Sequence, residues 1–378
     1  MNGKVLDVRK VGFPGNTSDS RSPESFAFPA SLTSLMECIG EDVRWETIQA
    51  HGREWTQRLM YKDILAASGM GFGLLWRNDL CPSSFDLTQV HADHNDTICR
   101  GFAYVGYECE VIERIDDNEA ALWAKITSEI DAGRPVLAFG IVGPPECCII
   151  AGYDADKKAL RGWSHFQSHD PAHCAENGMF LSSGWHANLW KTVVCGPKRD
   201  ARTSLKDVVR QGVEIMERNT VAGDPAKCSS EPSTLLMGFA AYDAWIAFVQ
   251  DPAFETMDDA TLKGKHWYHT TLVGSHAELR CYLGNFLAGQ VTGQNAEADK
   301  HLQEAARCLL EIHDQCWKLW GVLGGMGAPD AWQGLRDAAK RAELAAVLTH
   351  IKTLDRQAAD ALHAWVSAVR VRTIREPL

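Results

Sequence analysis

The first half of the chain alternates between helical and strand-like apolar patterns. Apolar residues at helical spacing predict helices over residues 29–40, near residues 45–59 and over residues 116–132. Short apolar runs bounded by Gly, Pro and Asp predict strands over residues 134–140, 147–153, 159–166 and 192–195. Helices followed by a meander of strands are typical of an α+β domain with an antiparallel sheet.

The second half has a different pattern. From about Ser204 onward the periodicity is helical, and we find no convincing strand. Helices are predicted over residues 204–219, 233–250, 265–288, 296–321 and 336–369. This pattern indicates a bundle of helices. We therefore expect an α+β domain over residues 1–203, followed by an all-α helical bundle domain over residues 204–378.

Composition and charge narrow the classes of function. The 38 Lys and Arg residues against 49 Asp and Glu residues give a net charge of −11, which disfavours a general nucleic-acid binder. No apolar stretch reaches the length of a signal peptide or of a membrane-spanning helix. We expect a cytoplasmic protein that binds neither nucleic acid nor a membrane. Its twelve Cys residues should then be reduced thiols, mostly packed in the core.

Three short segments carry a resemblance to a known fold. They are Pro29-Ala-Ser-Leu32 with Gly40, Ile130-Asp-Ala-Gly-Arg-Pro-Val136 and Glu146-Cys-Cys-Ile-Ile-Ala-Gly-Tyr-Asp154. The order of elements over residues 25–195 resembles the papain-like fold of the double-glycine-leader cysteine peptidases. It is more similar still to the N-terminal domain of the butirosin-biosynthesis acyltransferase family. The helical half resembles the bundle that follows this domain in uncharacterised bacterial proteins.

The resemblance implies a catalytic triad that this chain lacks. The peptidases need a Cys at the start of a helix, a His base and a carboxylate or amide that orients the His. In this chain the Cys position falls on Ala27, the His position on Glu146 and the orienting position near Trp163 or Ser164. A slip of one or two residues would offer Ser25 or Ser31 as a hydroxyl nucleophile, but it supplies no His. The resemblance therefore implies a fold and the place of a cleft, without the family's chemistry.

The strand that begins near Glu146 holds the candidate catalytic groups. Alternation along a strand puts Glu146 and Cys148 on one face, where a carboxyl against apolar walls could act as an acid or base. His165 is a candidate partner for that carboxyl. Alternatively, Glu146 bonds a loop backbone and both Cys147 and Cys148 are core residues.

Further candidates for ligand binding lie at the ends of predicted elements. Trp163 and Gln167 flank the end of the third predicted strand, and Ser31 lies in the first helix. The Gly-rich turn around Gly71 could bring backbone N–H groups to an anion, and Arg77 could clamp a carboxylate. A tight packing turn and an exposed Arg are the alternatives.

One predicted helix of the second half carries a polar stripe. His269, His276 and Arg280 fall near one face, and they could line a ligand pocket or form a hydrogen-bonded layer between helices. Four residues on the neighbouring helices could meet them, namely Asp243, Trp245, Glu311 and His313.

Two groups of His residues raise the question of a metal. They are His91 with His94, and His165 with His169, His173 and Cys174. No partner pair at fixed spacing completes either site, so we predict neither a metal nor a cofactor.

Two main functions remain open from the sequence. The first is a peptidase-like fold without its triad that binds a small molecule or a short peptide in the cleft near Glu146. The second is a non-standard amide- or acyl-transfer enzyme of small-molecule metabolism that uses Glu146 as acid or base. A third possibility is self-association through the helical half.

Overall fold

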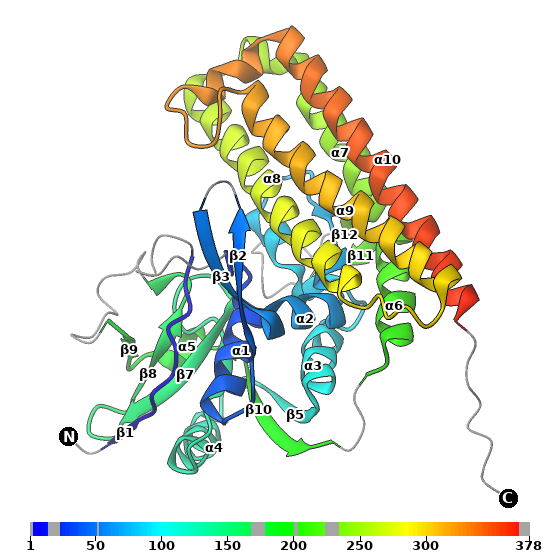
Figure 1. The fold of residues 1–378 in the computed structure, drawn as a ribbon. Helices are drawn as coiled ribbons and strands as arrows, with labels where there is room; N and C mark the ends of the chain where they lie inside the picture. The colour runs from blue at the N-terminus through cyan, green and yellow to red at the C-terminus, as the bar shows by residue number, and fades with distance from the viewer. Residues whose placement is uncertain are drawn as a thin grey trace, which may run out of the picture. The chain divides into compact units, whose positions relative to one another are not determined.

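The computed structural model describes residues 3–13, 23–50, 53–167, 178–199, 203–223 and 234–369 (Figure 1). The chain forms two compact units. Unit 1 comprises Met1–Ser68, Asp93–Thr203 and Gly223–Ser233, and unit 2 comprises Gly69–Ala92, Ser204–Ala222 and Thr234–Leu378. The sequence predicted a single domain boundary after residue 203. In the structure Gly69–Ala92, from the first half of the chain, also belongs to unit 2. The reason is a strand in this segment that pairs with a strand of the second half.

Unit 1 is built on an antiparallel sheet. Its strands follow the order β5-β10-β6-β7-β8-β9, and β1 pairs with the end of β7. The predicted strands over residues 134–140, 147–153, 159–166 and 192–195 are confirmed as β6, β7, β8 and β10. The bounds are β1 Gly3–Val5, β5 Tyr107–Glu113, β6 Val136–Phe139, β7 Cys147–Asp154, β8 Ala159–Ser164, β9 Phe180–Ser182 and β10 Lys191–Lys198.

Helices pack on both faces of this sheet. Cys148 and Ile150 of β7 belong to a buried apolar cluster with Leu122 and Ile126 of α4, whereas α1 packs on the opposite face of β6 and β7. The predicted helices over residues 29–40 and 116–132 are confirmed as α1 and α4. The bounds are α1 Ala27–Cys38, α2 Leu59–Ala67, α3 His94–Val105, α4 Glu119–Asp131 and α5 Trp185–Asn188.

The prediction of a helix near residues 45–59 is wrong. This segment forms an antiparallel hairpin of β2 Trp45–Ala50 and β3 Arg53–Arg58, and α2 begins only at Leu59. Thr47 lies opposite Thr56, and the Gln57 amide donates to the Glu46 carboxylate across the hairpin at 2.7 Å. β-Branched residues fit a pleated strand better than a helix, and cross-strand pairs add to that preference.

Unit 2 is mainly a set of long helices that lie side by side in the order α8, α9, α10, α7 (Figure 1). The five helices predicted in the second half are confirmed, except that the one predicted over residues 233–250 begins only at Gly238, after a short strand. Ser204, Asp258, Asn295 and Asp337 each accept backbone N–H bonds at a helix start, which fixes these boundaries. The bounds are α6 Leu205–Glu217, α7 Gly238–Gln250, α8 Asp259–Ala288, α9 Ala296–Val322 and α10 Ala338–Ala368.

Unit 2 also contains short strands and turns. The prediction of no strand after Ser204 is wrong, because β11 Thr220–Ala222 and β12 Thr234–Met237 form a small antiparallel sheet with β4 Leu75–Trp76. These strands are too short for a local alternating pattern to indicate them. Single 3-10 turns complete the unit: η1 Met70–Phe72, η2 Pro82–Phe85, η3 Leu87–Gln89, η7 Pro252–Glu255 and η8 Ala331–Arg336.

Within the part of the chain that the structure describes, no helix combines the length and the apolar character that crossing a membrane requires.

Candidate functional site

The start of β7 brings several of the sequence-predicted residues of unit 1 together. Cys147 is the first residue of β7, and the hydroxyl of Ser31 on α1 acts on its thiol. His165 directly follows β8, and its Nε2 lies 2.8 Å from the carbonyl oxygen of Glu24, just before α1. Glu146 directly precedes Cys147 in the chain.

Glu146 is the unusual carboxyl of unit 1. Its side chain is half-buried, and it forms no hydrogen bond or ion pair with any described residue. Burial raises the pKa of Glu146 to about 7. At neutral pH the carboxyl is therefore divided between its protonated and ionised forms, and neither form has a hydrogen-bond partner within the described part of the chain.

The strand argument placed Glu146 beside Cys148, and the structure gives a different neighbour. The chain turns at Pro144-Pro145, and the N–H of Glu146 donates to the Pro144 carbonyl at 2.6 Å. The strand begins only at Cys147, so the alternation of faces does not extend back to Glu146. The charge of Glu146 instead acts on Cys147, where it raises the pKa of the thiol.

Both thiols of β7 are held protonated. Burial is the main cause that raises the pKa of Cys147 well above its usual range, and the Ser31 hydroxyl opposes it. Burial raises the pKa of Cys148 to about 12, and Cys148 packs in the apolar cluster beside α4. A buried, protonated thiol is a poor nucleophile. Neither Cys has the electrostatic setting of a catalytic thiolate.

His165 is a neutral, buried side chain. Burial lowers its pKa to about 4, and the charge of nearby Arg58 acts in the same direction. The Nδ1 atom has no hydrogen-bond partner among the residues that the structure describes, and Phe13 packs edge-on against the ring. Arg58 itself forms an ion pair with Glu24 and donates to the Ser34 hydroxyl at 2.8 Å. With such a low pKa, His165 is a weak base at pH 7.

The side chains of Trp163 and Gln167 are hydrogen-bonded to backbone groups. The indole N–H of Trp163 donates to the Val8 carbonyl at 3.1 Å. The Gln167 amide accepts from the Ser164 N–H at 2.9 Å and donates to the Gly178 carbonyl at 2.6 Å. Both side chains thus hold chain segments in place around the end of β8.

The sequence-predicted residues of unit 2 form a buried network. The Arg280 guanidinium, 1% exposed, binds both carboxylate oxygens of Asp355 at 2.9 and 2.7 Å. It also donates to the carbonyl oxygen of Gly71 at 2.6 Å, so the Gly-rich turn offers an acceptor rather than N–H groups here. Tyr242 donates to Asp355 at 3.0 Å and contacts the Nε2 of His276 at 2.6 Å.

Four residues on neighbouring helices were predicted to meet this stripe, and only one of them, Trp245, contacts it. Trp245 donates to the Nδ1 of His269 at 2.9 Å, as the sequence allowed. Asp243 instead pairs with Lys352 on the surface. Glu311 bonds the exposed Arg307, and His313 contacts Trp317 on α9.

Sequence reasoning missed Tyr242 and Asp355. Asp355 falls on the apolar face of its helix, in step with Leu348, Ile351 and Leu362, which are all buried. A carboxylate in an apolar stripe is a signal that could have indicated a buried ion pair. Arg77, the other cationic candidate, binds the carboxylate of Asp79 at 2.9 and 2.6 Å.

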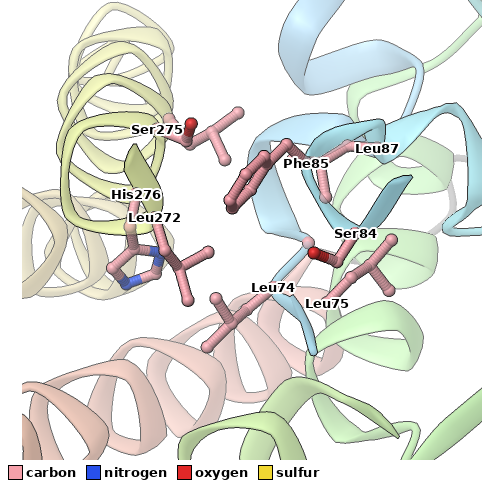
Figure 2. A pocket seen from close by; sticks show the side chains of 10 residues that line it. Leu74, Leu75, Ser84, Phe85, Leu87, Leu272, Ser275 and His276 are labelled. Atoms are coloured by element: carbon pink, nitrogen blue, oxygen red, sulfur yellow. The ribbon is translucent and has the colours of Figure 1, made fainter. Parts of the chain in front are cut away.

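A small cavity adjoins the network. It holds about 10 Å³, which is room for about one water molecule. Figure 2 shows His276 and Leu272 on one side of it, opposite Phe85 and Ser84. Because the hydroxyl proton of Tyr242 goes to Asp355, His276 donates from Nε2. Its buried Nδ1 has no hydrogen-bond partner in the described ranges. The stripe is therefore a hydrogen-bonded layer between helices, with space for a water rather than a metabolite.

The structure offers no metal centre among the residues it describes, where no three His, Cys, Asp or Glu side chains lie close enough to share an ion. His91 contacts the amide of Gln211 at 3.1 Å. His169, His173 and Cys174 lie outside the described residues.

No protein-family model matches the chain, and no curated protein matches its sequence. The papain-like resemblance therefore stays a prediction.

Proposed function

We propose that unit 1 binds a small molecule or a short peptide through the carboxyl of Glu146, in a papain-like fold whose triad is replaced. One observation carries this proposal: a half-buried carboxyl with a pKa of about 7 that forms no hydrogen bond or ion pair with any described residue. Such a group costs stability, because it loses contact with water without gaining a hydrogen bond. A ligand that donates a hydrogen bond recovers that loss.

The chemistry of the carboxyl defines the ligand class. When ionised, Glu146 can only accept hydrogen bonds, so an amide N–H or an ammonium group is the matching donor. An ammonium group would also lower the pKa of Glu146 and hold it ionised. Short peptides and small amides or amines carry these donors.

The groups around Glu146 favour binding over covalent chemistry. A thiol or hydroxyl nucleophile needs a base in reach. Cys147 is buried and protonated, and the Ser31 hydroxyl is buried beside its thiol. The Nε2 of His165 is hydrogen-bonded to the backbone carbonyl of Glu24 and is not available as a base.

A second candidate rests on the pKa of Glu146. A carboxyl that titrates near neutral pH suits general acid or base catalysis, as in an amide- or acyl-transfer enzyme of small-molecule metabolism. In that function Glu146 would pass a proton to or from a bound amide or ester, with a second substrate as the nucleophile.

The test compares Glu146→Gln with wild type and with Glu108→Gln, a control at an exposed Glu on β5. Native mass spectrometry looks for a co-purified small molecule, and thermal shift with a panel of dipeptide amides supplies defined probes. We expect binding in wild type and in Glu108→Gln, and a loss of tenfold or more in Glu146→Gln. Equal binding by all three proteins, or no binding by wild type, refutes the proposal. Conversion of a bound amide by wild type, absent in Glu146→Gln, favours the enzyme.

A further inference from the structure

Two cysteines of unit 1 that the candidate site does not use lie side by side. Cys99 is on α3 and Cys109 is on β5, and their Sγ atoms are 3.5 Å apart. The chain reverses between them at Gly106, whose φ of 92° suits glycine, so α3 leads directly into β5. Residues ten apart in sequence are thereby brought into contact. Cys99 is exposed and Cys109 is half-buried.

We propose that Cys99 and Cys109 are a thiol-oxidation site, in which Cys99 reacts with a hydroperoxide and Cys109 resolves the product as a reversible disulfide. A disulfide has an S–S length of about 2.0 Å, so the two sulfurs must approach by roughly 1.5 Å. Rotation of the two side chains about χ1, with a small shift of the helix, covers a movement of this size.

The contact between the sulfurs assigns the two roles. The Cys109 thiol donates its hydrogen to the Sγ of Cys99. This bond is the main cause that lowers the pKa of Cys99 to about 7, and Lys191 acts in the same direction against Asp93 and Asp96. The same bond raises the pKa of Cys109, which keeps its proton. The exposed sulfur is thus the thiolate, and the less exposed sulfur is the thiol.

The reaction balances in two steps. The Cys99 thiolate attacks the terminal oxygen of the hydroperoxide, an S–O bond forms, the O–O bond breaks, and the leaving alkoxide takes a proton to give an alcohol. The Cys109 sulfur then attacks the Cys99 sulfenic acid, the S–S bond forms and the S–O bond breaks. Hydroxide leaves with the Cys109 proton as water. The thiol pair loses two electrons, and the hydroperoxide gains them.

A third thiol, that of Cys195, lies near this pair but differs from Cys99 in exposure and in pKa. Cys195 on β10 is the ladder partner of Cys109, so it is also close in the sheet. It is buried, and burial raises its pKa to about 11. Cys195 therefore lacks both the access and the thiolate that the first step needs.

The first measurement is the pH profile of iodoacetamide labelling, read by peptide mass spectrometry. A thiol of pKa about 7 is half ionised at pH 7, against about 3% for an ordinary Cys of pKa near 8.5. Its lower intrinsic nucleophilicity offsets part of this roughly 16-fold gain, leaving a rate about threefold higher. We expect a labelling midpoint near pH 7 at Cys99. In Cys109→Ala, which removes the donor, the midpoint should move up toward 8.5.

The second measurement treats wild-type protein with hydrogen peroxide at pH 7 and maps its peptides without reduction. We expect the Cys99 and Cys109 peptides to be joined with the loss of two hydrogen atoms, and dithiothreitol to reverse the link. The control Cys195→Ser should form the same link, whereas Cys109→Ser should stop at oxidised Cys99. Irreversible over-oxidation of Cys99 in wild type, or a link that involves Cys195, overturns the proposal. The decisive comparison uses wild type alone, so a misfolded variant does not obscure it.

Discussion

The buried ion pair of unit 2 gives a sharp prediction about stability. Asp355→Asn keeps the shape of the side chain and removes its charge, which leaves the Arg280 guanidinium charged and 1% exposed. In wild type this group has charge-assisted bonds to both oxygens of Asp355, and Tyr242 donates to one of them. The substitution converts the best acceptor of the network into an amide that must turn its NH₂ toward Arg280 or Tyr242.

The magnitude follows from the environment of the pair. Breaking a buried ion pair by removing one charge costs about 3–5 kcal/mol. For a unit of this size, each kcal/mol lowers Tm by about 2–4 °C, so we expect a fall of about 6–20 °C. The surface pair of Asp243 and Lys352 is the matched control, and Asp243→Asn should cost less than about 1 kcal/mol.

Urea denaturation followed by tryptophan fluorescence measures both variants. A double variant, Arg280→Met with Asp355→Leu, removes both charges and should recover much of the loss, since a hydrophobic pair of similar volume is often as stable as a buried ion pair. The reasoning is refuted if Asp355→Asn costs no more than Asp243→Asn. It is also refuted if the losses of Arg280→Met and of Asp355→Leu, each measured alone, simply add in the double variant.

Two further predictions concern Glu146 and one glycine. The folded-state pKa of Glu146 is raised from about 4.5 to about 7, so its ionisation lowers the free energy of unfolding as the pH rises through that window. Glu146→Gln should therefore gain about 2–3 kcal/mol relative to wild type between pH 5 and pH 8, measured by urea denaturation, and a pH-independent difference contradicts the raised pKa. Gly238 has a φ of 55°, and a Cβ there would lie 2.1 Å from the Met216 carbonyl oxygen, so Gly238→Ala should lower the free energy of unfolding by about 2 kcal/mol or more. Gly264→Ala, in α8 with no atom within 4 Å of the added Cβ, should instead raise it by up to about 1 kcal/mol, and the same sign for both variants would contradict the backbone argument.

The sequence by itself determined seven of the ten helices that the structure describes and four of its strands. It did not predict α2, α3 and α5 or the strands β1, β5 and β9. Periodicity and capping residues indicated α1, α4 and all five helices of the second half, because a helix is stabilised by contacts within a few residues along the chain. The apolar runs likewise indicated four strands of the main sheet. The hairpin of β2 and β3 and the short sheet of β4, β11 and β12 were missed, because strand pairing depends on partners that local propensity does not reveal.

For the candidate residues, the tertiary structure decided which neighbour each one has. The sequence singled out Arg280 as a ligand group, but its carboxylate partner is 75 residues away on another helix. It singled out the Cys147-Cys148 pair as the cysteines of interest, but strand alternation buries these thiols on opposite faces of the sheet. Among the cysteines that the structure describes, the exposed one with a thiol partner is Cys99, which no local pattern marked. Charge pairing, burial and thiol reactivity depend on distances through space, and only the folded chain sets those distances.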